Sequence, residues 1–157
     1  MIAPLFNAQD DEWVVHVGRY ILNMGALEMA TRLIIARIHG TDQVPIFSSD
    51  LAARLGYIRK RYPRTDKPLH ERAMNALNVA ERHTGFRNVV AHSPIAISGN
   101  ADGTFKIQGI MNVTPKSSTT ISELISLDEL KGRVNESAAV AREVLEMQSV
   151  FPVKASG

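Results

Sequence analysis

The stretch from Asp10 to Ile38 constrains the fold more than any other part of the chain, because its apolar side chains recur at helical spacing. This pattern predicts one long helix, and Gly40 supplies a stop signal directly after it. The residues that we expect on the buried stripe of this helix are Val14, Val17, Ile21, Met24, Thr31 and Ile35.

Glu28 interrupts that stripe with a carboxylate. It lies seven residues after Ile21 and therefore on the same face of the helix. Because an unpaired carboxylate is costly to bury, we expect Glu28 to be paired or functional. Gly18 and Gly25 are also seven residues apart, and their lack of a side chain permits close approach of another helix.

Two further helices are expected in the middle of the chain. Ser48 and Ser49 are good N-cap residues, so a second helix is expected from there to about Tyr62. Pro68 fits the first turn of a third helix, which the apolar spacing extends to His92.

Beyond the third helix, the apolar period changes to that of a strand. Ile95 and Ile97 alternate with small residues, and Phe105 and Ile107 alternate with polar ones. Glycine, asparagine and aspartate between these pairs supply turn chemistry, so we expect a β-hairpin over about residues 95–112.

The last helix is expected to begin at Ser126, which forms a capping box with Glu129, and to reach about Gln148. The polar stretch from Pro115 to Thr120 is expected to be a loop. The order of elements predicts a single domain over residues 1–157 that is mainly all-α. Its predicted architecture is a four-helix up-down bundle with a β-hairpin inserted before the last helix.

The composition fits such a domain and excludes several classes of protein. A length of 157 residues indicates one domain, and 45% apolar with 22% charged residues is typical of a soluble globular protein. There is no cysteine and no short cluster of histidine and acidic residues, so we expect no disulfide, no metal site and no cofactor. Because we find neither a signal peptide nor a bilayer-spanning apolar run, we expect a cytoplasmic location and no membrane partner.

The segment from Phe86 to Pro94 is where we expect chemistry. It places Arg87, Asn88 and His92 near the end of the third helix, with Arg87 on the apolar face. Pro94 biases the residue before it away from helical dihedrals, so His92 is expected at the helix end. The apolar neighbours of these polar groups indicate that they point into a site rather than into bulk water.

Structural interpretations of the same residues stay open. An arginine on one buried stripe near a glutamate on another is often an internal ion pair. A histidine at a helix C-terminus is favoured electrostatically by the exposed carbonyl groups, and this implies no catalysis.

The form Arg-Asn-x-x-Ala-His resembles the motif of the HEPN superfamily, whose members are small helical bundles with an arginine and a histidine near the end of a long helix. Arg87 and His92 fit this motif with four residues between them, and Asn88 fills the polar position after the arginine. The segment from Gly18 to Glu28 also resembles the start of such domains.

This resemblance implies a metal-independent endoribonuclease that acts as a homodimer, with the motifs of two chains in one cleft. It also implies a prokaryotic toxin or defence effector with an antitoxin-like protein partner. In such a site, His92 would transfer protons, Arg87 would bind phosphate oxygens and Asn88 would orient His92. Glu28 would hold Arg87, or its counterpart in the second chain, in place.

Basic residues gather around the second helix and its exit, and two tyrosines lie among them. Such a patch can follow an RNA backbone while the tyrosines stack on bases, and a solvated helix face is the alternative interpretation. The candidate RNA-binding residues are Arg54, Arg59, Lys60, Arg61 and Arg64, together with Tyr57 and Tyr62.

Two alternatives to RNA cleavage remain open. Many HEPN members resemble non-catalytic, dimeric interaction or regulatory modules. A nucleotide-binding protein without cleavage would use Arg87 and the basic residues on phosphates, because the sequence has no glycine-rich phosphate loop.

Overall fold

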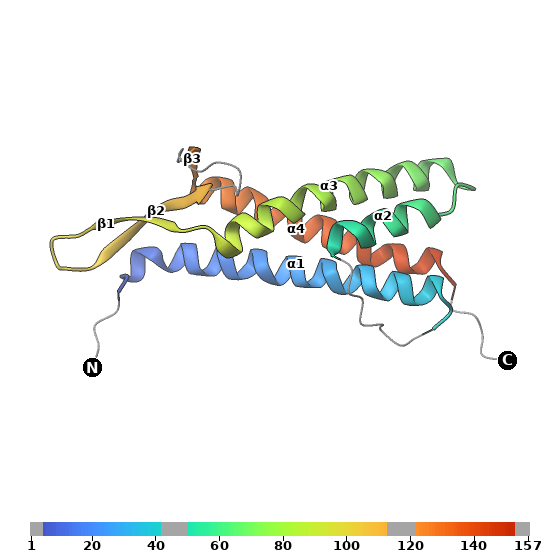
Figure 1. The fold of residues 1–157 in the computed structure, drawn as a ribbon, viewed down its shortest axis with the longest axis horizontal. Coiled ribbons are helices and arrows are strands. Elements are labelled where there is room, and N and C mark those ends of the chain that lie inside the picture. The colour runs from blue at the N-terminus through green and yellow to red at the C-terminus, as the bar shows by residue number, and fades with distance from the viewer. Residues whose placement is uncertain (1–4, 42–49, 113–121, 153–157) are drawn as a thin grey trace.

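The computed structural model describes residues 5–41, 50–112 and 122–152. Over these residues the chain is mainly helical, with four α-helices and a small three-stranded antiparallel sheet (Figure 1). The elements are α1 (Asp11–Ile38), α2 (Leu51–Arg61), α3 (Lys67–His92), β1 (Ile95–Gly99), β2 (Phe105–Asn112), β3 (Ser122–Ile125) and α4 (Leu127–Glu146), with short 3-10 turns at Ala8–Asp10 and Met147–Val150.

Polar caps explain where the later helices begin. The carboxylate of Asp66 accepts a hydrogen bond from the Leu69 amide at the start of α3, at 3.1 Å. Ser126 accepts one from Glu129 at the start of α4, at 3.1 Å, which confirms the expected N-terminus of this helix. The cap of α2 is Asp50, so this helix begins slightly later than expected; the predicted caps Ser48 and Ser49 lie outside the described residues.

The directions of the helices depart from a strict up-down order. On α2, Arg54 lies beside residues 28–31 of α1, and Tyr57 contacts His39 at the C-terminal end of α1. Contacts that advance together along both helices mean that α1 and α2 are parallel. Figure 1 shows α4 running the same way and α3 returning. The up-down order therefore fails at α2, which the chain enters beside the second half of α1.

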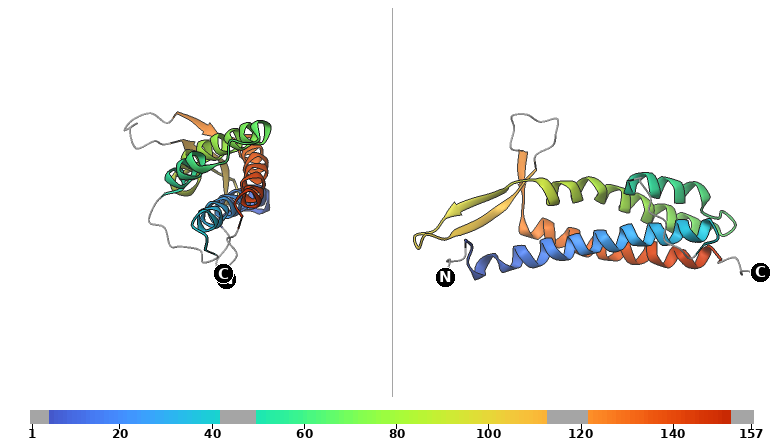
Figure 2. Two further views of the ribbon diagram at one scale, coloured as in Figure 1. Left: turned by 90° about the vertical axis from the view of Figure 1, so that its right-hand side faces the viewer. Right: turned by 60° about the horizontal axis from the view of Figure 1, so that its bottom comes forward.

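The core lies between all four helices, and α1 and α4 lie side by side along most of their length (Figure 2). The stripe that α1 buries differs from the predicted one. Met24, Thr31 and Ile35 are buried as expected, but Val14 is 65% exposed and Ile21 is 38% exposed. The other large apolar residues of α1 in the core are Trp13, Tyr20, Leu27 and Ile34. Apolar residues occur on nearly every side of α1, so spacing alone did not identify its inner face.

The predicted hairpin is present as β1 and β2, which pair antiparallel from Ile95 opposite Ile110 to Gly99 opposite Phe105. The third strand, β3, was not predicted, because a segment of four residues carries little periodicity. It pairs with β2 through Ile125 opposite Ile110. The sheet extends beyond the helices at the end where α1 begins and α3 ends (Figure 1).

The N-terminal segment joins this sheet to the helices. Asp10 is 2% exposed, and its carboxylate accepts a hydrogen bond of 2.9 Å from the Ile107 amide in β2. Within the described part of the chain, no helix is long and apolar enough to cross a membrane.

Candidate functional site

The three motif residues occupy the last part of α3. Arg87 is half-buried, whereas Asn88 and His92 are exposed. The Arg87 guanidinium donates from Nη1 to the side-chain oxygen Oδ1 of Asn88 at 3.4 Å, which is a long hydrogen bond. Ser93 leaves the helix in an extended conformation before Pro94, so His92 is the last helical residue, as the sequence predicts.

A cavity of about 370 Å³ opens between α1, α2 and α3 beside Arg87. Its walls combine three arginines with two carboxylates, so the cavity carries an excess of positive charge. The polar residues that line it are Glu28 and Arg32 from α1, Asp50 and Arg54 at the start of α2, and Thr84, Arg87 and Asn88 from α3.

Arg54 is the buried cation of this cavity, with 3% of its surface exposed. Its Nε donates to the Thr31 hydroxyl at 3.0 Å, and its Nη2 lies 3.9 Å from the Glu28 carboxylate. Burial and the nearby charge of Arg32 lower the pKa of the Arg54 guanidinium, and Glu28 and Asp50 oppose this shift. Arginine is nevertheless charged at neutral pH, so two like charges face the same space.

Glu28 is paired, as expected for a carboxylate on that side of α1, but its ion-pair partner is Arg54. Among the described residues, no ion pair joins Glu28 to Arg87. The two side chains line the same cavity from opposite helices. Glu28 therefore orients the buried Arg54, and the role of holding Arg87 is not seen.

His92 does not line this cavity. It lies four residues after Asn88, which places these two side chains on one face of α3, whereas Arg87 is about 100° of helical turn away from Asn88. The motif is thus divided: Arg87 faces the cavity, Asn88 lies at its rim, and His92 is one turn beyond the rim.

The predicted basic surface is only partly exposed. Arg59 is paired with Glu81, at 2.7 Å, while the guanidinium of Arg61 lies over the Tyr57 ring with its Cζ 3.6 Å from the centroid. Lys60, Arg61 and Arg64 are exposed.

Two members of the predicted surface are buried instead. Tyr62 is 4% exposed and packs edge-on against Phe151, so its ring is not available to stack on a base. Arg54 points into the cavity described above. A charge pattern in sequence does not show which side of a short helix faces the core.

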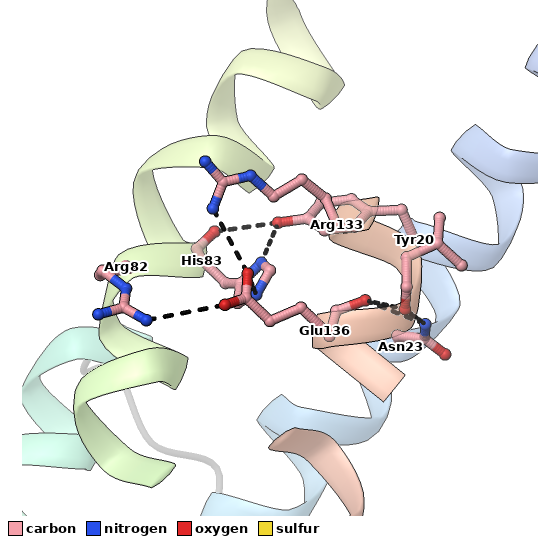
Figure 3. A network of polar contacts seen from close by, with 8 residues as sticks. Tyr20, Asn23, Arg82, His83, Arg133 and Glu136 are labelled. Atoms are coloured by element: carbon pink, nitrogen blue, oxygen red, sulfur yellow. Dashed lines mark hydrogen bonds and ion pairs between the residues drawn. The ribbon is translucent and has the colours of Figure 1, made fainter. Parts of the chain in front are cut away.

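A second polar cluster, which the sequence did not indicate, joins α1, α3 and α4 (Figure 3). His83 is completely buried, and its Nδ1 lies 3.0 Å from the Tyr20 hydroxyl. Its Nε2 lies 3.1 Å from a carboxylate oxygen of Glu136, although this contact is misaligned for a hydrogen bond. Arg82 and Arg133 contact the same carboxylate at 3.7 and 3.4 Å.

The environment of this cluster keeps the histidine neutral. Burial lowers the pKa of His83, with the attraction of Glu136 opposing it, and burial also raises the pKa of the Tyr20 phenol well above its usual value. The position of His83, three residues after the buried Ala80, was the signal that could have identified it as an inner residue.

Comparisons of the chain with protein-family models, with curated proteins and with solved structures find no match. The resemblance of Arg87, Asn88 and His92 to the HEPN motif therefore stays a prediction. Within the described ranges, no group of three or more histidine or acidic side chains is placed to hold a metal ion.

Proposed function

We propose that this chain is a metal-independent endoribonuclease of HEPN type that acts as a homodimer in the cytoplasm. One observation carries the proposal: Arg87 and Asn88 line a cavity together with Arg32 and Arg54, and His92 is exposed one turn beyond its rim. A phosphate binder and a titratable base thus occur within two turns of one helix.

The charge of the cavity favours a phosphate. Arginine presents a planar fork of donors that matches two phosphate oxygens. Arg32 and Arg54 face the same cavity and repel each other, and this repulsion adds to burial in lowering the pKa of Arg54. An anion bound between them would relieve this repulsion, and Arg87 would add a third guanidinium from the opposite wall.

Cleavage of RNA without a metal needs two proton transfers. The ribose 2′-oxygen attacks the phosphorus as its proton leaves to a base, and the 5′-oxygen departs as it takes up a proton. The products are a 2′,3′-cyclic phosphate and a 5′-hydroxyl. An imidazole side chain such as that of His92 suits either transfer. Water would serve for the other one.

The exposed cations beyond the cavity would extend the contact with RNA. Lys60, Arg61 and Arg64 lie on and after α2, whose first turn lines the cavity. Phosphate contacts of this kind give affinity without base specificity. The proposed role is that of a toxin or defence effector, held inactive by an antitoxin-like protein.

The test is cleavage of a labelled RNA pool by purified protein in excess EDTA. We expect products with 2′,3′-cyclic phosphate ends, and a loss of about 10²-fold or more in rate for Arg87→Ala and for His92→Ala. Arg142→Ala on α4 and His16→Ala on α1 are matched controls away from the cavity and should keep full activity. Activity that survives His92→Ala, or no cleavage of any RNA by the unmodified protein, would overturn the proposal.

The position of His92 outside the cavity favours a second candidate, which is phosphate-ligand binding without cleavage. In that case a nucleotide or RNA would bind the unmodified protein and Arg87→Ala would weaken binding, whereas His92→Ala would not. A filter-binding titration of both variants, run beside the cleavage assay, separates the two functions.

A further inference from the structure

We propose that the outward face of α1 is the surface through which two copies of this chain pair, with their α1 helices antiparallel. The proposal rests on the homodimer of the proposed function and specifies its interface. It comes from the apolar side chains that the fold leaves uncovered, and not from the motif on α3.

The outward face of α1 is apolar for most of the length of the helix. Leu22 is 74% exposed and Val14 is 65% exposed, and Met29, Val15 and Ile21 are exposed by 48%, 43% and 38%. Scattered exposed apolar residues are normal, but a continuous apolar face marks an interaction surface. In Figure 1, α1 is the lowest helix of the view, on the far side from α3.

The spacing on this face is that of a coiled-coil seam. Its central residues follow one another in steps of three and four, which is the heptad period of helices that pack along their length. Large apolar residues alternate with glycines along the seam. The residues are Val15, Gly18, Leu22, Gly25 and Met29.

The packing within a single copy does not require glycine at positions 18 and 25. A Cβ atom built at Gly18 or at Gly25 would meet no atom within 4 Å, so nothing in the described structure requires their small size. Glycine also weakens a helix interior relative to alanine. Both glycines lie on the seam, where they would let a second helix approach closely.

The face is complementary to itself when two copies run antiparallel. We place a twofold axis between Ile21 and Leu22. Each residue of one copy then lies opposite a residue of the other copy, and the two residue numbers add up to 43. The pairs are then Gly18 with Gly25, Ile21 with Leu22, Val14 with Met29, and Asp11 with Arg32.

The charges at the ends of the face fix this orientation. Antiparallel pairing sets Asp11 of each copy against Arg32 of the other, whereas parallel pairing would set like charges together. Asp11 is exposed and Arg32 is half-exposed, and no ion pair is seen for either among the described residues. A second copy of this chain therefore satisfies both the apolar face and its terminal charges.

This pairing would bear on the candidate site. Arg32 belongs to the pair and also lines the cavity beside Arg87. A twofold axis perpendicular to α1 leaves both cavities on the same side of the pair. The two Glu28 positions would lie about 20 Å apart along the helices, at 1.5 Å per residue. The two cavities would then be separate sites that one RNA strand can contact, rather than the single shared cleft that the HEPN resemblance implies.

The first test is the molar mass of the full-length protein by light scattering during gel filtration. We expect a dimer that Leu22→Glu converts to a single chain. Leu145→Glu on α4, where Leu145 is 47% exposed, is the matched control and should leave the dimer intact. A single chain at every concentration, or a dimer that Leu22→Glu leaves unchanged, would overturn the proposal. Circular dichroism shows that both variants are folded.

The second test determines the relative direction of the two α1 helices by disulfide cross-linking. The sequence has no cysteine, so only the introduced cysteines can form a disulfide. Leu22→Cys lies next to the twofold axis and should form a disulfide with itself. Val14→Cys should not, since its copies would be about 22 Å apart, but it should cross-link to Met29→Cys in a mixture. Self cross-linking of Val14→Cys would show parallel helices and contradict the proposed register.

These outcomes are separate from those for the proposed function, because neither test contains RNA. A dimer that forms the predicted cross-links but cleaves no RNA would support the proposed interface and contradict the proposed ribonuclease activity. Cleavage by a protein that stays a single chain would keep the ribonuclease and remove the interface.

Discussion

The hydroxyl group of Tyr20 lies 3.0 Å from Nδ1 of His83, and this contact joins α1 to α3 inside the core. The same hydroxyl lies 3.3 Å from the main-chain oxygen of His83. Glu136 of α4 approaches the other ring nitrogen, which favours the tautomer with the proton on Nε2 and Nδ1 as the acceptor. Three helices thus meet at one buried imidazole.

Replacement of Tyr20 by phenylalanine keeps the ring and removes the hydroxyl group. Because His83 is completely buried, its Nδ1 would lose a hydrogen bond that water cannot replace. We expect Tyr20→Phe to lower the free energy of unfolding by about 1–3 kcal/mol, measured by urea denaturation. Tyr57→Phe, which removes a bond to the exposed His39, is the control and should cost less. Equal losses of unfolding free energy in the two variants would show that the buried contact contributes no more to stability than the exposed one.

The burial of His83 predicts that this side chain stays neutral down to a lower pH than an ordinary histidine. Its pKa is lowered mainly by burial, with Arg133 and Arg82 adding to the shift and Glu136 opposing it. In a ¹⁵N–¹H spectrum of the imidazole nitrogens, we expect the His83 signals to titrate below pH 6.5, the ordinary value for histidine. Titration of His83 at or above pH 6.5 would contradict this prediction.

The same shift predicts how stability depends on pH. The pKa of His83 in the folded chain lies below the value of about 6.5 in the unfolded chain, so the unfolded chain binds more protons between these two values. The contribution of neutral His83 is therefore complete above pH 6.5. It falls by up to about 1.4 kcal/mol for each pH unit as the pH drops toward the folded-state pKa. Urea denaturation at a series of pH values measures this slope.

The buried Arg54 predicts different costs for the loss of two of its partners, Thr31 and Glu28. Thr31 accepts a bond from its Nε at 3.0 Å, whereas Glu28 lies 3.9 Å away and is 34% exposed. We expect Thr31→Val to cost about 1.5–3 kcal/mol and Glu28→Gln less than about 1 kcal/mol. Thermal or urea denaturation of both variants checks the order. A larger cost for Glu28→Gln would make the ion pair the main support of Arg54.

The sequence predicts that the helices are present, because N-cap residues and helix-breaking residues act on the chain next to them. Ser126 and Pro94 fixed the start of α4 and the end of α3 within the chain that flanks them. The sequence does not predict the direction of α2 relative to α1, because this direction depends on which residues of α1 the helix packs against. The contact of Arg54 with residues 28–31 of α1 decides this, and it joins positions far apart in the sequence.

The candidate site was predictable in the same partial way. Arg87 and Asn88 were identified from a local motif, and they line the cavity. Arg32 was not assigned to the site, because only the packing of α1 against α2 and α3 brings it there. The basic neighbours of Tyr62 predict a surface position, but the ring of Phe151, which follows the last 3-10 turn, packs against it.

Two glycines predict opposite results for the same substitution. A Cβ atom at Gly109 in β2 would lie 2.9 Å from the main-chain oxygen of Ile125 and 2.9 Å from the Cβ of Leu124, so β3 would have to move. We expect Gly109→Ala to destabilise the protein by about 1–3 kcal/mol. Gly132 in α4 is exposed with nothing within 4 Å, so Gly132→Ala should stabilise it by about 0.5–1 kcal/mol. Urea denaturation of the two variants measures both signs. A neutral Gly109→Ala would mean that β3 does not pack against β2 as closely as described.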